Sequence, residues 1–167
     1  TIFVVEASSY QLEYSKLFRS NISAILNISP DHLERHNTLK KYVRAKFKIV
    51  KNQTKKDYAI VNMKNLYIKR EIKIKNFLPK LIKINKYTDL KLIKKINNPY
   101  FYSESNRENL SFVLQISKIL RIKKNDLFKT LKKFKGLKYR QQIIFRSKDL
   151  TIINDSKSTS FSSSVSI

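Results

Sequence analysis

Apolar residues in the first half of the chain gather in four short runs that are rich in β-branched side chains. The runs cover residues 1–5, 22–28, 58–61 and 81–84. Runs of this kind are typical of strands that are buried on both faces of a parallel sheet. We therefore predict four strands, and the first of them ends directly before Glu6.

Apolar residues at helical spacing separate these runs. A helix can begin at a Ser8 or Ser9 cap, a basic amphipathic helix is predicted over 38–50, and a weakly patterned helix over 66–74. Strands that alternate with helices form right-handed βαβ units. The fold class that we predict is therefore α/β: a three-layer, mostly parallel sheet with helices on both faces.

The second half begins without a clear pattern and then becomes helical. Residues 85–98 mix Lys and Asn with scattered apolar positions and give no firm prediction, whereas 100–102 indicate a short strand after Pro99. Apolar residues then follow helical spacing over 106–120 and 125–134, so two helices are predicted there.

Gly136, the only glycine, comes just past the second of these helices, where a left-handed cap is needed. Two strand-like runs at 141–146 and 150–154 follow, joined by a polar turn. This change of pattern predicts a domain boundary near 136–138. The Ser-rich segment 156–167 fits either a disordered tail or the start of another helix.

The formal net charge of +24 favours nucleic acid as a partner, because a cationic surface attracts polyphosphate. However, Lys supplies 28 of the 36 basic residues, and Ile and Asn are also abundant, whereas Gly and Ala are rare. Lys, Ile and Asn have A- and T-rich codons, so genome composition explains much of the charge. The basic residues are spread along the whole chain with few interleaved aromatic residues, which disfavours a stacking platform for bases.

The residue types that the chain lacks exclude several kinds of site. Without Cys there is no disulfide, thiolate metal site or cysteine nucleophile, which fits a reducing compartment such as the cytoplasm. No apolar stretch reaches the roughly 18 residues that span a bilayer, and no basic leader opens the chain. One glycine is too few for a P-loop or a dinucleotide-binding turn. A start at Thr1, on a strand-like run, suggests a fragment.

Polar side chains follow the first two predicted strands. Glu6 ends the first strand, and Asp31 and His32 come just after the second. Carboxyl ends of parallel strands meet at one edge of a sheet, where ligands gather. A carboxylate and an imidazole there could hold magnesium and an anion, although an isolated Glu or His in such a place is more often a helix cap or a packed turn residue.

Three ordered strings closely resemble the central domain of the Mur ligases. They are Glu6-Ala-Ser-Ser-Tyr-Gln-Leu-Glu13, Ile25-Leu-Asn-Ile-Ser-Pro-Asp-His-Leu-Glu-Arg-His36 and Tyr42-Val-Arg-Ala-Lys46. The tail is similar to the start of the family's carboxyl-terminal domain in Phe134-Lys-Gly-Leu-Lys-Tyr-Arg140 and Asn154-Asp-Ser-Lys-Ser-Thr159. The string from Ser8 to Glu13 most resembles the members that add D-glutamate.

The resemblance implies two domains and an activity. Residues 1–136 would be a partial central ATPase domain without its P-loop part, and 137–167 the truncated start of an amino-acid-binding domain. The activity would be that of an ATP-dependent amide ligase in peptidoglycan synthesis, with ATP and Mg²⁺ as cofactors. Its partners would be UDP-N-acetylmuramoyl-L-alanine and D-glutamate, with no nucleic acid or membrane. The complete protein would be a cytoplasmic monomer.

The resemblance also implies roles for three residues of the first part. Glu6 is similar to a magnesium ligand, and His32 matches a catalytic histidine beside the second metal and the substrate carboxylate. Lys46 matches the catalytic lysine that the family modifies with CO₂. A carbamate turns the cation into an anionic two-oxygen group that a hard metal can use. Its formation requires a neutral amine, so the pKa of Lys46 would have to be lowered by burial or neighbouring cations.

Nucleotide and amino-acid contacts are implied in the second part. Asn106 and Asn109, three apart at the start of a helix, resemble the asparagine pair near the adenine site, although the family's usual Gly-x-His-Asn is Ser-Glu-Ser-Asn here.

Other matched residues follow in the tail of the chain. Those that match contacts to the nucleotide ribose and phosphates are Arg140, Asp155 and Lys157. Thr159 matches a contact to D-glutamate.

In the family, a uridine-nucleotide domain and a Gly-rich ATP loop would precede Thr1. We therefore expect that the 167-residue chain does not ligate by itself. Three other interpretations stay open: a Mur ligase that adds another amino acid, a basic nucleic-acid-binding module with salt-sensitive binding, and a non-catalytic remnant.

Overall fold

The computed structural model describes residues 1–30 and 33–158 of the chain. The chain divides into two compact units, Thr1–Lys86 and Tyr87–Ile167. Within the described residues, no helix combines the length and the apolar character that a membrane crossing requires.

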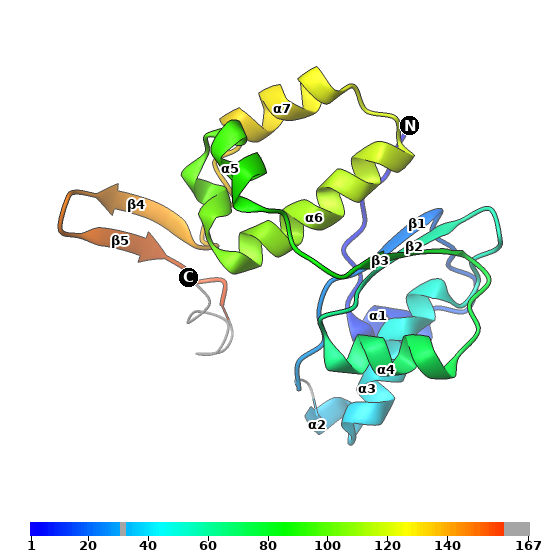
Figure 1. The fold of residues 1–167 in the computed structure, drawn as a ribbon. Helices are drawn as coiled ribbons and strands as arrows, with labels where there is room; N and C mark the ends of the chain where they lie inside the picture. The colour runs from blue at the N-terminus through cyan, green and yellow to red at the C-terminus, as the bar shows by residue number, and fades with distance from the viewer. Residues whose placement is uncertain (31–32, 159–167) are drawn as a thin grey trace. The chain divides into compact units, whose positions relative to one another are not determined.

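A three-strand parallel sheet forms the centre of the first unit (Figure 1). Its strands β1 (Ile22–Ile25), β2 (Tyr58–Asn62) and β3 (Lys80–Ile84) are adjacent in that order. The central strand is the most buried, because Ala59, Ile60 and Val61 have almost no exposed surface. The β-branched runs therefore predicted these three strands correctly, and the α/β class with a parallel sheet is confirmed.

The helices of the first unit follow the βαβ order. They are α1 (Ser9–Tyr14), α2 (Leu33–His36), α3 (Leu39–Lys46), the 3₁₀ helix η1 (Phe47–Val50) and α4 (Leu66–Ile74). Thr38 caps α3 as predicted, because its hydroxyl accepts the Lys41 N–H at 3.2 Å. In Figure 1, α1, α3 and α4 lie together on one side of the sheet, and a helical layer on its other face stays a prediction.

The strand predicted over residues 1–5 is absent. Residues 1–8 have no regular secondary structure, and Phe3 and Val4 are 84% and 97% exposed. An apolar run becomes a strand only where another strand satisfies its backbone groups and a second layer covers its side chains. Among the described residues, no strand pairs with this segment. The helix expected after Ser8 ends at Tyr14, which leaves Leu17 exposed.

A buried carboxylate joins the segments that precede β1 and β2. Asp57 is 1% exposed, and its oxygens accept from Arg19 Nε at 2.9 Å and Nη2 at 3.1 Å. They also accept from the Thr54 backbone N–H at 2.7 Å and from Asn21 Nδ2 at 3.4 Å. The Arg19 guanidinium, followed by the Thr54 N–H, holds the pKa of the Asp57 carboxyl well below its usual range.

This carboxylate predicts a pH dependence of stability. Because its pKa is lower in the folded chain than in the unfolded chain, the unfolded state binds more protons as pH falls. The stability that Asp57 contributes is complete above the unfolded pKa of about 3.9. It is lost progressively as the pH falls below that value toward the lower pKa of the folded chain. Urea unfolding of the chain and of its Asp57→Asn variant at several pH values in this window should give a shallower pH slope for the variant. Equal slopes would contradict the assignment.

The second unit is built from helices and a hairpin. Its elements are α5 (Leu90–Ile96), the 3₁₀ helix η2 (Pro99–Tyr102), α6 (Glu104–Ile119), α7 (Lys124–Lys133), β4 (Gln142–Arg146) and β5 (Thr151–Asn154). Its buried core consists of Ile93, Ile96, Phe101, Leu110 and Leu131. Helices α6 and α7 and the antiparallel β4–β5 pair confirm the predictions for this half.

Two segments of this unit differ from the sequence interpretation. Helix α5 lies in the stretch that gave no prediction, where Asp89 caps it by accepting the Leu92 N–H at 2.8 Å and Asn97 ends it at φ 54°. Residues 100–102 form η2 rather than a strand. Asn98 accepts the Tyr100 N–H at 3.0 Å and starts a helical turn that buries Phe101, so local capping decides the conformation.

Gly136 adopts φ 78°, in the left-handed region, as the sequence predicts. A Cβ at this position would lie 2.5 Å from Cε2 of Tyr100, whose ring packs edge-on against Phe101 and Phe134. Gly136→Ala is therefore expected to destabilise the chain by about 1–3 kcal/mol, from backbone strain and displacement of the ring. Urea unfolding measures the change, with the exposed neighbour Lys135→Ala as control. Equal unfolding midpoints for the two variants would contradict it.

Candidate functional site

The string that most resembles the D-glutamate-adding ligases folds as a short capped helix. The Ser8 hydroxyl accepts the Gln11 N–H at 3.2 Å, and the Gln11 side chain accepts the Ser8 N–H at 2.8 Å. This reciprocal pair is a capping box, which fixes where α1 begins. Ser9 and Leu12 then face inward and are buried.

Basic residues of α2 and η1 bind the carboxyl-terminal end of α1. The Lys48 ammonium donates to the Glu13 carbonyl at 2.6 Å, and Arg35 Nε lies 3.7 Å from the Glu13 carboxylate. The Arg35 guanidinium also donates to the Tyr14 hydroxyl and stacks over that ring at 5.5 Å. Helix α1 is thereby held against α2 and η1.

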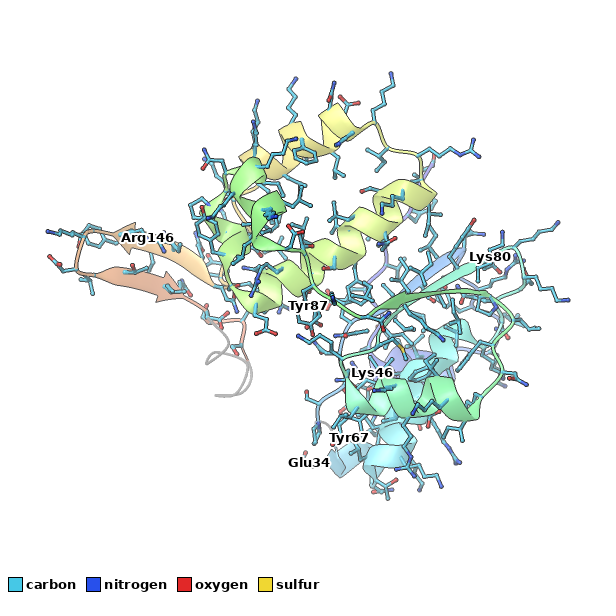
Figure 2. All side chains as sticks on the ribbon, viewed as in Figure 1. Glu34, Lys46, Tyr67, Lys80, Tyr87 and Arg146 are labelled. Atoms are coloured by element: carbon cyan, nitrogen blue, oxygen red, sulfur yellow. The ribbon has the colours of Figure 1, made fainter. Side chains whose placement is uncertain are left out.

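Lys46 occupies the last position of α3, on a helix as predicted. It is half-buried, and Figure 2 places it in the first unit below the sheet. Its Nζ lies 5.2 Å from the ring centroid of Tyr42, one helical turn earlier. An ammonium at this distance from an aromatic face is attracted by the ring quadrupole. The Tyr42 ring therefore favours this position of the Lys46 ammonium.

The other two residues of the expected metal site are placed differently. Glu6 is exposed and belongs to the irregular segment before α1. His32 lies outside the described residues, as does Thr159. Over residues 1–30 and 33–158, no group of three His, Cys, Asp or Glu side chains could hold a metal ion. That Glu6, His32 and Lys46 converge stays a prediction.

An asparagine that the sequence interpretation passed over organises the carboxyl edge of the sheet. Asn65 follows β2, and its amide oxygen accepts the N–H groups of Tyr67 and Ile68 at 3.2 Å to cap α4. Its Nδ2 donates to the Ile28 carbonyl at 2.8 Å. Asn65 thus fixes the segment that leads from β1 toward residues 31–32. The signal in the sequence was an Asn directly before an apolar helical pattern.

Asn106 and Asn109 lie in the first turns of α6, as predicted. The cap of this helix is Ser103, whose hydroxyl accepts the Asn106 N–H at 3.3 Å. The buried Asn106 side chain donates to the Tyr100 carbonyl at 2.8 Å and to Gln141 Oε1 at 3.4 Å. Asn109 is exposed one turn later.

Gln141 connects Asn106 with Asp155. Its backbone N–H donates to Asp155 Oδ1 at 3.0 Å, and its side chain accepts from Asn106. Gln141 itself adopts a positive φ of 46°, and the nearby Tyr139 a positive φ of 65°. The Tyr139 carbonyl accepts the Lys157 N–H at 3.0 Å. Four of the residues expected to contact the nucleotide therefore lie in or next to one hydrogen-bonded turn: Asn106, Arg140, Asp155 and Lys157. No pattern in the sequence points to Gln141.

The charge of Arg140 reaches Tyr100 in the same region. Burial raises the pKa of the Tyr100 hydroxyl, and the Arg140 guanidinium opposes that rise. The side chains of Arg140 and Lys157 are exposed. Both can therefore contact an anionic ligand without first breaking a buried ion pair.

A separate pocket of about 340 Å³ lies at the opposite, amino edge of the sheet. Its lining comes from the segments before β2 and β3, including Phe47, Lys51, Gln53 and Phe77. The buried Gln53 side chain donates to the carbonyls of Ser20 and Tyr58, at the starts of β1 and β2. This location is not where ligands gather in open parallel sheets.

Comparison with known proteins decides the family. The family model of the Mur ligase middle domain matches residues 1–136. The chain belongs to the Mur ligase family. The end of the matched segment coincides with Gly136, after which the helices give way to the β4–β5 hairpin.

Curated relatives of this family match nearly the whole chain. It is 31% identical over 182 residues to a UDP-N-acetylmuramoylalanine–D-glutamate ligase of Lachnoclostridium phytofermentans, covering 99% of this chain and 40% of the relative. A ligase with the same name from Natranaerobius thermophilus is 34% identical over 180 residues, covering 97% and 39%. The chain therefore spans about 40% of the length of these relatives.

A solved structure shows the same fold. MurF from Acinetobacter baumannii superposes with a TM-score of 0.59 at 19% identity, over 81% of this chain and 33% of that chain. At this identity the likeness concerns the fold alone. Together with the family match, it supports the α/β class predicted from the alternating strands and helices.

Proposed function

We propose that the chain is part of an ATP-dependent ligase that adds D-glutamate to UDP-N-acetylmuramoyl-L-alanine in peptidoglycan synthesis. The observation that carries the proposal is that relatives named for this activity align with 95–99% of the chain. Residues 1–136 would belong to the central ATPase domain and 137–167 to the start of the amino-acid-binding domain. The complete enzyme would act as a cytoplasmic monomer.

The proposed reaction joins a carboxylate to an amine in two steps. An oxygen of the L-alanyl carboxylate attacks the γ-phosphorus of ATP, and ADP leaves. The D-glutamate amine then attacks the carbonyl carbon of the acyl phosphate, inorganic phosphate leaves, and the nitrogen loses a proton. Because several anions must approach one another, the protein has to supply fixed positive charge and hydrogen-bond donors.

The first unit would supply the metal ligands. Glu6 provides a carboxylate, and Lys46 as a carbamate would provide two further oxygens, a donor set that suits Mg²⁺. His32 would lie beside the metal and the substrate carboxylate. When bound, Mg²⁺ offsets the negative charge of the transferring phosphoryl group. The contact between Lys46 and Tyr42 supports the proposal, because it limits where the amine can lie.

The second unit would bind the nucleotide. Asn106 and Asn109 would contact the adenine, and Arg140, Asp155 and Lys157 the ribose and phosphates. The hydrogen bonds from Asn106 to Gln141 and from Gln141 to Asp155 support this grouping, because one turn holds residues that are far apart in the sequence. Thr159 would contact the incoming D-glutamate.

Purification of the product of the complete open reading frame that encodes the chain tests the proposal. ATP-dependent phosphate release should require both UDP-N-acetylmuramoyl-L-alanine and D-glutamate, and the gene should rescue a strain whose own D-glutamate ligase is conditional. Activity with a different amino acid would indicate another Mur ligase. Absence of any ligation, together with steeply salt-dependent binding of nucleic acid, would overturn the proposal in favour of a basic binding module.

A further inference from the structure

His36 is buried where three helices of the first unit meet. It ends α2, and only 3% of its surface is exposed. Its Nε2 lies 3.0 Å from the hydroxyl oxygen of Ser9, in the first turn of α1. Its ring centroid lies 5.6 Å from that of Tyr10 and 5.3 Å from that of Tyr42. The imidazole therefore contacts α1 and α3 at once.

The hydrogen bond explains why a polar ring is accommodated here. A buried imidazole that lacks partners loses the free energy of its hydration, whereas a bond to a buried hydroxyl restores part of it. Ser9 is also buried, so neither group can exchange this bond for one to water without opening the junction. The orientation of the His36 ring is thereby tied to α1.

The same ring packs against the residue that contacts Lys46. Tyr42 is 4% exposed, so its position depends on its packed neighbours, including His36. Lys46 Nζ lies 5.2 Å from the Tyr42 ring centroid. A series of contacts thus runs from Ser9 through His36 and Tyr42 to Lys46. It links the Ser8–Glu13 string to the end of α3.

We propose that His36 is a positioning residue, which holds the Tyr42 ring and through it limits the positions of the Lys46 side chain. The inference rests on the proposed function in so far as the positioned group is the carbamate-bearing lysine. A lysine side chain has four rotatable stem bonds and loses considerable rotamer freedom when it is fixed. The carbamate nitrogen keeps one N–H, which can face an aromatic ring as a weak donor. The ring contact is therefore compatible with the modified side chain.

Reductive ¹³C-methylation of the lysines of the 167-residue chain tests the positioning without requiring activity. The ring current of Tyr42 should displace the Lys46 dimethylamine signal from those of exposed lysines, and Lys46→Arg identifies that signal by its loss. In His36→Ala and Ser9→Ala the signal should move to the position of exposed lysines. His36→Gln can place Nε2 near the position of the imidazole Nε2 and should keep the displacement, whereas His36→Asn is too short and should lose it.

Two outcomes of this experiment would overturn the inference. One is a Lys46 signal that is not displaced in the unsubstituted chain. The other is a displaced signal that stays unchanged in Ser9→Ala and His36→Ala while the circular dichroism spectra match. Ser9→Ala removes only a hydroxyl group, so it keeps the test decisive if His36→Ala fails to fold.

Unmethylated protein of the complete open reading frame separates this inference from the proposed function. In ¹³C-bicarbonate, a carbamate carbon signal that disappears in Lys46→Arg reports the modification directly. Ser9→Ala should lower the carbamate fraction about two- to tenfold at fixed CO₂, because the less restricted Lys46 side chain has more rotamer freedom to lose when the carbamate is fixed. If the carbamate never forms although the ring-current displacement depends on His36, then the proposed role of Lys46 fails and the positioning stands.

Discussion

Asp57→Ala is expected to lower the free energy of unfolding of the chain by about 2–4 kcal/mol, because several hydrogen bonds to one charged group are lost together. The carboxylate joins Arg19 and Asn21, before β1, to Thr54, before β2. Its removal leaves the Thr54 backbone N–H without its acceptor and disconnects the segments that precede β1 and β2. Arg19 itself is partly exposed and regains water, so the loss is smaller than for a fully buried ion pair.

Urea unfolding at pH 7, followed by circular dichroism, measures this effect. Asp149→Ala is the matched control, because Asp149 is an exposed aspartate in a turn and its removal should change stability by less than about 0.5 kcal/mol. Asp57→Asn keeps the shape of the side chain but places an amide N–H₂ group next to groups that are themselves hydrogen-bond donors. It should therefore recover little of the lost free energy of unfolding. A change below 1 kcal/mol for Asp57→Ala would show that the cluster does not stabilise the amino edge of the sheet.

Lys46→Ala in the complete enzyme is expected to reduce ligation by at least about 100-fold, as for other groups that stabilise charge in a transition state. Lys46→Arg should be equally inactive. A guanidinium stays protonated at any working pH, so it cannot provide the neutral nitrogen that CO₂ attacks. The proposed role therefore depends on an amine that can become an anionic oxygen ligand, and the positive charge of the side chain does not supply it.

Initial rates of D-glutamate-dependent phosphate release measure this loss. Lys40→Ala is the control, because Lys40 is exposed on the same helix and its removal subtracts an equal charge. Added bicarbonate should raise the rate of the unsubstituted enzyme when CO₂ is limiting and have no effect on Lys46→Arg. A Lys46→Ala enzyme that keeps a third or more of the rate would rule out the assigned role.

The strands and the capped helices were predictable because their causes are local. The runs at 22–28 and 58–61 contain mostly apolar residues, and Thr38 precedes a helical pattern, so short stretches of sequence carry enough information. Helix α5 could also have been predicted from the sequence. Asp89 at its start and Asn97 at its end are cap signals that the Lys- and Asn-rich composition obscured.

Other failures arise where the outcome depends on distant residues, unlike residues 100–102, where a local cap decided the conformation. The apolar run at 1–5 has the composition of a strand, but a strand forms only beside a partner, and no local pattern contains the partner. Lys46 was found among 28 lysines through the Tyr-x-x-x-Lys spacing of a family string. The connections made by His36 and Gln141 were not found, because each joins residues about 14 to 35 positions apart.

The left-handed turns of this chain show how a fold persists when glycine becomes scarce. Asn37, Asn97 and Arg121 all adopt φ between 54° and 60° at exposed positions. The left-handed region costs less for Asn or for an unbranched side chain than for a β-branched one. Gly136 differs, because an aromatic ring closes over its backbone and leaves no room for a side chain. A drift in codon usage toward A and T can therefore replace glycine at exposed helix ends. Where an aromatic ring packs over the turn, any Cβ would clash with the ring, so glycine has to stay.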